Sequence, residues 1–244
     1  MYWQIIIFSL LTFVSTFLGG LFAIKYKEKI HQVMAFAAGV LLGVVSFEIL
    51  PEIIEQVNTY SFNSIDIMIA LVLGFFIFHI LEKTILIQHC HEEDCAIHKK
   101  HPHIGIASAA ALIGHSFIDG IGIGLGFQVN IATGMLVATA VISHSFTDGL
   151  NSMAFLLNNG NAEKRSKIIL LFHALAPILG AASTLLFTLS PYYLTLYLGF
   201  FAGFLLYIGA SDILPEAHSK ESSYKIMALT VLGALFIFVV SRFI

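Results

Sequence analysis

Long apolar stretches alternate with short polar ones along almost the whole chain. A helix needs roughly 20 apolar residues to cross the hydrocarbon core of a bilayer. Eight stretches reach that length, and the pattern therefore predicts an all-α polytopic membrane protein in which residues 1–244 form a single membrane domain. The predicted helices lie near residues 4–24, 32–54, 65–87, 104–127, 131–157, 168–189, 192–214 and 225–243.

The composition agrees with this pattern. The chain is 58% hydrophobic and 11% charged, whereas about 25% of the residues of a soluble domain are charged. Its mean hydropathy is +0.90. The net charge of −3 and the lack of a basic patch with interleaved aromatic residues exclude nucleic acid as a partner. The lipid bilayer is the expected surrounding, and the first apolar stretch is expected to be a retained helix because no positive segment precedes it.

Positive charges gather on one side of the predicted helices. Eleven of the twelve Lys and Arg residues lie there, and only Arg242 falls on the other side. The positive-inside rule assigns the richer side to the cytoplasm. We therefore expect both termini outside, and the cell (inner or plasma) membrane as the location.

Two short segments echo each other in helices that are predicted to run in opposite directions. Glu48-Ile-Leu-Pro-Glu52 is expected to end the second helix, and Asp212-Ile-Leu-Pro-Glu216 the seventh. Such a match indicates an inverted repeat of helices 1–3 and 6–8 around a central pair, a 3+2+3 arrangement in which substrate binds near the midplane. The alternative is a chance match between two common helix terminators.

The central pair of predicted helices carries one motif twice, as His115-Ser-Phe-Ile-Asp119-Gly120 and His144-Ser-Phe-Thr-Asp148-Gly149. Helical residues four apart lie on one face, and ionisable groups at membrane depth are costly and usually functional. If the two faces meet, two nitrogen and two oxygen donors converge on a site suited to Zn²⁺, and also to Fe²⁺, Mn²⁺ or Cd²⁺. The alternative is two hydrogen-bonded His–Asp pairs with a structural role only.

Other polar residues are candidates for the same site or for a route to it. Ser116 and Ser145 adjoin the two histidines and could bind metal weakly or orient water. A helix break at Pro177 could turn His173 into the site. Carboxylates outside would attract cations and those inside would release them, unless they are merely solvated. The lower-ranked residues of this route are Glu48, Glu52, Asn151, His173, Asp212, Glu216 and His218.

The longest predicted loop, residues 88–103, is dense in soft and borderline metal ligands. It lacks the regular spacing of a zinc finger, so a preformed structural site is not expected. On the cytoplasmic side it could capture or sense metal, or serve only as a polar linker. Its candidate ligands are His89, Cys90, His91, Cys95, His98, His101 and His103.

These features together resemble the ZIP (Zrt/Irt-like) family of divalent metal transporters. The two helix motifs are similar to the His-Asn-x-Pro-Glu-Gly signatures of that family, and eight spans, outside termini, a histidine-rich loop and Leu-Pro-Glu segments also fit. The resemblance implies that helices 4 and 5 hold the transported metal. It assigns ligand positions to His115, Ser116 and Asp119 in the first motif, and to Ser145 and Asp148 in the second.

The chain departs from the family pattern at several motif positions. Both family glutamates are aspartates here, and the motif prolines are replaced by Ile118 and Thr147. Many family members have a glutamate where this chain has Ala176, and His173 is a candidate replacement for that carboxylate. One-ion and two-ion sites therefore stay open as alternatives.

The sequence thus predicts uptake of a divalent metal, zinc first, into the cytoplasm by alternating access at the midplane His/Asp site. The metal would be the substrate, with no cofactor and no enzymatic activity, and no phosphate-binding loop for ATP occurs in the sequence. One alternative is an intramembrane zinc-dependent hydrolase that uses the same cluster. Another is a metal-sensing membrane protein that uses the cytoplasmic loop. Homodimerisation is left open.

Overall fold

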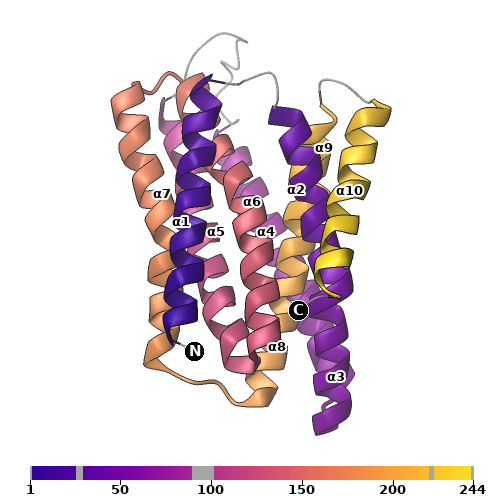
Figure 1. The fold of residues 1–244 in the computed structure, drawn as a ribbon. Coiled ribbons are helices and arrows are strands. Elements are labelled where there is room, and N and C mark those ends of the chain that lie inside the picture. Colours follow the sequence, from indigo (N-terminus) through magenta and orange to yellow (C-terminus); the bar gives the residue numbers. More distant parts are fainter. Residues whose placement is uncertain (1, 26–29, 90–101, 220–222, 243–244) are drawn as a thin grey trace.

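The computed structural model describes residues 2–25, 30–89, 102–219 and 223–242. Within these residues the regular elements are all helical, and the long helices stand side by side in a bundle (Figure 1). Six of them are long and apolar enough to cross a membrane. The chain is therefore a polytopic helical membrane protein, as predicted. The count of eight spans is finer than this finding and stays a prediction.

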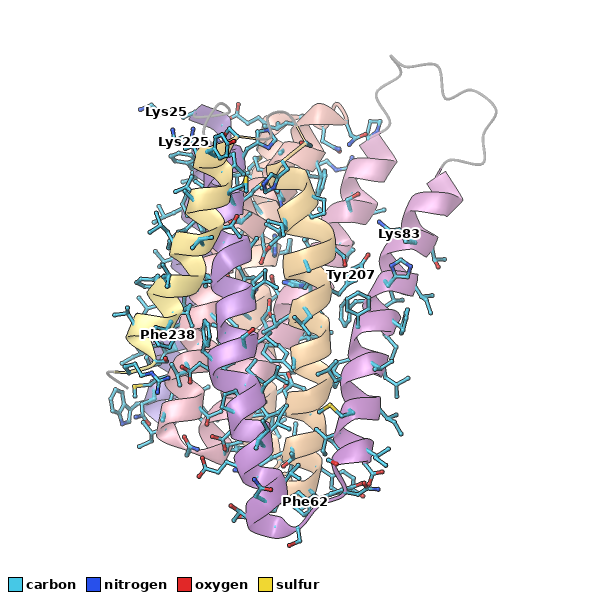
Figure 2. The ribbon with its side chains drawn as sticks, turned by 90° about the vertical axis from the view of Figure 1, so that its right-hand side faces the viewer. Lys25, Phe62, Lys83, Tyr207, Lys225 and Phe238 are labelled. Carbon is cyan, nitrogen blue, oxygen red and sulfur yellow. The ribbon has the colours of Figure 1, made fainter. Side chains whose placement is uncertain are left out.

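Successive long helices run in opposite directions along the bundle, so their ends lie at its two ends (Figure 1). Lys25 and Lys225 lie at one end of the molecule and Phe62 at the other (Figure 2). The α-helices are α1 (Tyr2–Lys25), α2 (Ile30–Val44), α3 (Leu50–Tyr60), α4 (Ser64–His89), α5 (Pro102–Val129), α6 (Ile131–Asn158), α7 (Glu163–Ser183), α8 (Pro191–Leu206), α9 (Leu214–Ala217) and α10 (Tyr224–Val240). Three short segments connect some of them, the π-helical η2 (Val45–Ile49) and η4 (Tyr207–Ile213) and the 3₁₀-helical η3 (Thr184–Leu186).

The first echoing segment does not end its helix, contrary to the sequence-based expectation, whereas the second lies at the end of its helix, as expected, because α9 ends at Ala217. A proline inside a helix removes one backbone hydrogen bond and crowds the preceding turn. Here a π-helical turn comes just before each proline, η2 before Pro51 and η4 before Pro215, and the wider turn accommodates the ring. α3 then continues through polar residues to Tyr60, and Ser61 ends it in the left-handed conformation (φ 54°).

The long helices divide into two bundles. α1, α5, α6 and α7 pack on one another, and we call them the site bundle. In the flanking bundle, which comprises α2–η2–α3, α4, α8–η4–α9 and α10, α2 packs along α10 and α4 along α8. Both of these pairs approach closely at glycines, since a Cβ at Gly39 would lie 1.9 Å from the Thr230 carbonyl oxygen and one at Gly203 1.8 Å from that of Leu71. The two bundles meet mainly where α2 packs on α6.

Candidate metal centre

The two repeated motifs bring four buried side chains together in the middle of the site bundle. His115 and Asp119 come from α5, and His144 and Asp148 come from α6. Each of the four is at most 6% exposed. Their ligand atoms all lie within 4.8 Å of one another, an arrangement that could hold a metal ion. The expected convergence of two imidazoles and two carboxylates is therefore present.

One nitrogen of each imidazole faces one oxygen of each carboxylate. Nε2 of His115 lies 3.0 Å from Oδ2 of Asp119 and 3.5 Å from Oδ2 of Asp148. The Nε2 atom of His144 lies 3.2 Å and 3.6 Å from the same two oxygens. Each histidine thus contacts the aspartate of its own motif and that of the other motif. This cross-pairing argues against two independent His–Asp pairs.

Charge balance explains what such a cluster can bind. Nδ1 of His144 lies 2.9 Å from the carbonyl oxygen of Ala140, and a carbonyl only accepts, so Nδ1 carries its hydrogen and donates it. A hydrogen on Nε2 would be donated to Asp119 at 3.2 Å, and once it is lost the Nε2 lone pair faces the two buried carboxylates. Buried charges need compensation, and one divalent cation, or two protons, would balance both aspartates.

Several atoms of the cluster are also left without conventional partners. Nε2 of His115, Oδ1 of Asp119 and Oδ2 of Asp148 are buried and make no hydrogen bond of good geometry among the described residues. Buried polar atoms are nearly always satisfied. Together with the donor types, these atoms fit a cation better than a closed protein hydrogen-bond network.

The motif glycines set how closely the neighbouring helices approach. A Cβ on Gly120 would lie 2.1 Å from the carbonyl oxygen of Pro177 in α7, and a Cβ on Gly149 would lie 1.9 Å from that of Thr16 in α1. No side chain can occupy such space. The glycine after each aspartate therefore lets the motif helix pack directly on another backbone, which fixes the position of the aspartate beside it.

The two motif serines differ in their contacts. Oγ of Ser116 lies 2.8 Å from Nε2 of His173, and both side chains are buried. Oγ of Ser145 instead donates to the carbonyl of Val141 in its own helix at 2.6 Å. α7 continues through Pro177 without interruption, so the expected break is absent. His173 nevertheless reaches the region of the cluster.

A second polar region lies where α3 and the beginning of α6 meet. A cavity of about 410 Å³ has Glu48, Glu52 and Glu55 in its wall, together with Asn130 and Thr133. Glu52 accepts a hydrogen bond from Thr133 at 3.1 Å. The predicted outer carboxylates are thus brought together, at a distance from the central cluster.

Two other predicted residues, Asn151 and His218, do not join the cluster. Asn151 is half-buried on α6, and Nδ1 of His218 donates to the carbonyl of Leu214 in its own turn. The side chains of Asp212 and Glu216 lie outside the described part of the structure, as do those of the loop candidates His89, Cys90, His91, Cys95, His98, His101 and His103.

Two neighbours of the cluster were not predicted. The ring of Phe204, in α8, lies against His115 with centroids 4.8 Å apart. Ser152, one turn beyond Asp148, is fully buried and its hydroxyl has no partner among the described residues. The four-residue spacing from Asp148 could have indicated Ser152, whereas nothing in the sequence links Phe204 to His115.

Comparison with known families agrees with this geometry. A sequence model described as the ZIP zinc transporter family matches residues 88–241, which is more than half of the chain. The matched region contains α5, α6 and α7, and therefore all four residues of the cluster. No curated protein matches the chain significantly.

Proposed function

The chain belongs to the ZIP zinc transporter family, and we propose that it carries zinc into the cytoplasm by alternating access at the His/Asp cluster of α5 and α6. The observation that carries the proposal is the cross-paired cluster, in which two copies of one motif converge inside the apolar helix bundle. Burying four ionisable groups in apolar helices costs free energy, and groups retained at such a cost usually have a function. A divalent cation passing through the cluster would balance their charge.

The types of the four donors and the family description support zinc as the leading cargo. Zinc binds nitrogen and oxygen ligands at about 2.0–2.2 Å in a tetrahedron, so neighbouring ligand atoms lie roughly 3.3–3.6 Å apart. The four Nε2–Oδ2 distances run from 3.0 to 3.6 Å, whereas the separations within the whole ligand set extend to 4.8 Å, so the remaining pairs would have to draw together around a tetrahedral ion. Two imidazoles and two carboxylates also suit Fe²⁺, Mn²⁺ and Cd²⁺, which are the competing cargoes in any assay.

The close helix contacts support the inverted 3+2+3 repeat. Each motif glycine packs on a backbone carbonyl of a neighbouring helix. Three residues earlier, the backbone carbonyl of the motif phenylalanine is approached in turn by a glycine of that same neighbouring helix. The flanking bundle shows the same reciprocal pattern in α2–α10 and in α4–α8. The contacts are Gly120–Pro177 with Phe117–Gly180, Gly149–Thr16 with Phe146–Gly19, Gly39–Thr230 with Phe36–Gly233, and Gly203–Leu71 with Phe200–Gly74.

The numbering of these contacts agrees with the sequence echo. Gly39 and Gly203 are 164 residues apart, and so are Glu48 and Asp212. One shift therefore relates α2–η2–α3 to α8–η4–α9, including the π-helical turn before each proline. Such a repeat needs eight spans. Beyond the six apolar helices, α6 has 28 residues and α10 has 17, lengths that suffice to cross a bilayer.

The two bundles support alternating access by movement of one group of helices against the other. All four cluster residues belong to the site bundle. Within that bundle the backbones touch at glycines, which makes it a stiff unit. The flanking bundle meets the site through side chains such as Phe204. A shift between bundles would therefore change access to the cluster without separating its ligands.

The acidic cavity supports a route from the outer side. Thr133 and Val137 of α6 line it, and His144 follows Val137 by seven residues, about 10.5 Å along a helix. Between them, Ala140 and Val141 are fully buried. The cavity would concentrate cations, and the apolar turn would keep it apart from the cluster in this conformation. Asn151 and Ser152 would continue the route toward the cytoplasm, with Asp212, Glu216 and His218 at its end.

Family membership favours a transporter over the hydrolase and over a metal sensor. The repeat supports the same choice, since hydrolysis requires no inverted symmetry. We place the protein in the cell membrane, with both termini outside. Its partners would be divalent metal ions and lipid, and homodimerisation is left to measurement.

Uptake into proteoliposomes tests the proposal. The purified parent protein should move Zn²⁺ into vesicles down a gradient, whereas Asp119→Ala and Asp148→Ala should not. Asp66→Ala is a matched control, because Asp66 lies at the start of α4 and accepts a hydrogen bond from Tyr192. A parent protein that moves no divalent ion would refute transport. Alanine variants that match the parent would refute the site.

A further inference from the structure

The repeat pairs every residue of α7 with one of α1, and this comparison singles out His173. Thr16 and Gly19 correspond to Pro177 and Gly180 in their contacts, 161 residues apart in each case. The same shift pairs His173 with Thr12. Oγ1 of Thr12 donates to the carbonyl of Phe8 in its own helix at 2.9 Å.

On the α1 side of the cluster, the hydroxyls are therefore occupied locally. Thr12 and Ser145 both bond to carbonyls one turn earlier in their own helices. Each of them thus donates its hydrogen within its own helix. α1 contains no histidine, so the α1 side offers no imidazole to the site.

On the α7 side the arrangement differs. His173 is fully buried, and its Nε2 lies 2.8 Å from Oγ of Ser116. Its Nδ1 is buried and has no hydrogen-bonding partner among the described residues. Because Ser116 directly follows His115 in α5, this contact places the ring of His173 beside the cluster, although it lies outside the compact set of four.

Which nitrogen of the His173 ring carries the hydrogen decides whether Nδ1 can bind a metal ion. A hydrogen on Nδ1 would be a buried donor without an acceptor, which is costly. With the hydrogen on Nε2, the ring donates to Ser116 and leaves a lone pair on Nδ1. Metal-binding histidines commonly have this form, with one nitrogen hydrogen-bonded and the other free for the ion.

We propose that His173 is a specificity-determining residue of the metal site, whose Nδ1 supplies a third imidazole nitrogen from the α7 side while Ser116 orients its ring. The inference rests on the proposed function and deepens it. Imidazole favours Zn²⁺ over harder cations such as Mn²⁺, which prefer oxygen ligands. His173 would therefore raise the preference of the site for zinc beyond what the symmetric cluster provides.

The test is the ratio of kcat/KM for Zn²⁺ to kcat/KM for Mn²⁺ in proteoliposomes. His173→Gln keeps the volume and a donor toward Ser116 but removes the imidazole, and it should lower the ratio by about tenfold or more. His79→Gln is the matched control, because His79 makes aromatic contacts in the flanking bundle with Phe76 and Tyr207, and should leave the ratio unchanged. Equal loss of both activities in His173→Gln would show a structural role and overturn the proposal.

A spectroscopic measurement separates this inference from the transport proposal. Co²⁺ serves as the probe for binding in detergent, and its visible absorption reports the number of nitrogen ligands. The spectrum should differ between the parent and both His173→Gln and His173→Ala, while His79→Gln should match the parent. Identical spectra in all four proteins would refute the role of His173. If the spectra of the two His173 variants differ from that of the parent but the parent transports no metal, transport is refuted and His173 remains a ligand.

Discussion

Nε2 of His144 lies 3.2 Å from Oδ2 of Asp119, so the histidine of one motif copy meets the aspartate of the other. The same oxygen of Asp119 also lies 3.0 Å from Nε2 of His115, the histidine of its own motif. Asp148 lies farther from both rings, at 3.5 Å and 3.6 Å. The cluster is therefore a single unit in which Asp119 holds the more central place, even though the two motifs look equivalent in sequence.

This difference predicts unequal effects of two conservative substitutions. Asp119→Asn should lower zinc affinity by more than the roughly 10–100-fold that loss of a supporting hydrogen bond costs a metal site, and Asp148→Asn should lower it less. Titration calorimetry of the protein in detergent measures both. The control is Asp66→Asn, which leaves the cluster untouched. Equal losses in the two cluster variants would contradict the central role of Asp119.

The glycine contacts predict matched effects on stability. Gly120→Ala and Gly149→Ala each force a methyl group against a backbone carbonyl, at 2.1 Å and 1.9 Å. Overpacking of this kind typically costs about 1–3 kcal/mol of unfolding free energy, and thermal unfolding in detergent should show it for both.

Gly114→Ala provides the control in the same helix. A Cβ at Gly114 meets nothing within 4 Å, and alanine favours helix more than glycine does. This variant should be as stable as the parent or slightly more stable. If Gly120→Ala and Gly149→Ala unfold at the temperature of Gly114→Ala, the backbones are farther apart than this structure has them.

Local patterns explain which features were predictable. The spacing of His115 and Asp119 fixes one helical face, and its repetition at His144 and Asp148 indicated a shared site. The contact of Ser116 with His173 joins residues 57 apart, and it depends on how closely α5 and α7 approach. The continuation of helix through Pro51 was missed because proline normally ends a helix, whereas here a π turn absorbs it. Packing between helices distant in sequence decided the first of these, and the π-helical turn decided the second.

Acidic conditions should weaken transport. The cluster binds a cation only when both imidazoles present free lone pairs, so metal binding releases protons and protons compete with metal. Zinc uptake should therefore decrease as the pH falls from about 8 to about 5, the range in which histidine usually titrates. The decrease should appear mainly as a higher KM, measured at several zinc concentrations with the internal pH held constant. An unchanged KM across this range would show that neither histidine must lose a proton to bind metal.

The acidic cavity should govern capture of metal more than its movement through the protein. Glu52 lines the cavity and accepts hydrogen bonds from Thr133 and Gln56. Glu52→Gln removes one negative charge while the side chain keeps its size, so cations should be concentrated less at this face. Charged clefts raise capture rates by factors of about 10 or more at low salt.

We therefore expect Glu52→Gln to lower kcat/KM for Zn²⁺ by several-fold at low ionic strength, with kcat nearly unchanged. The difference from the parent should shrink as salt screens the cavity. Glu163→Gln is the control, since Glu163 begins α7 and pairs with Lys167, away from this cavity. A fall in kcat at saturating zinc that salt does not alter would instead mean that Glu52 acts on a step after capture.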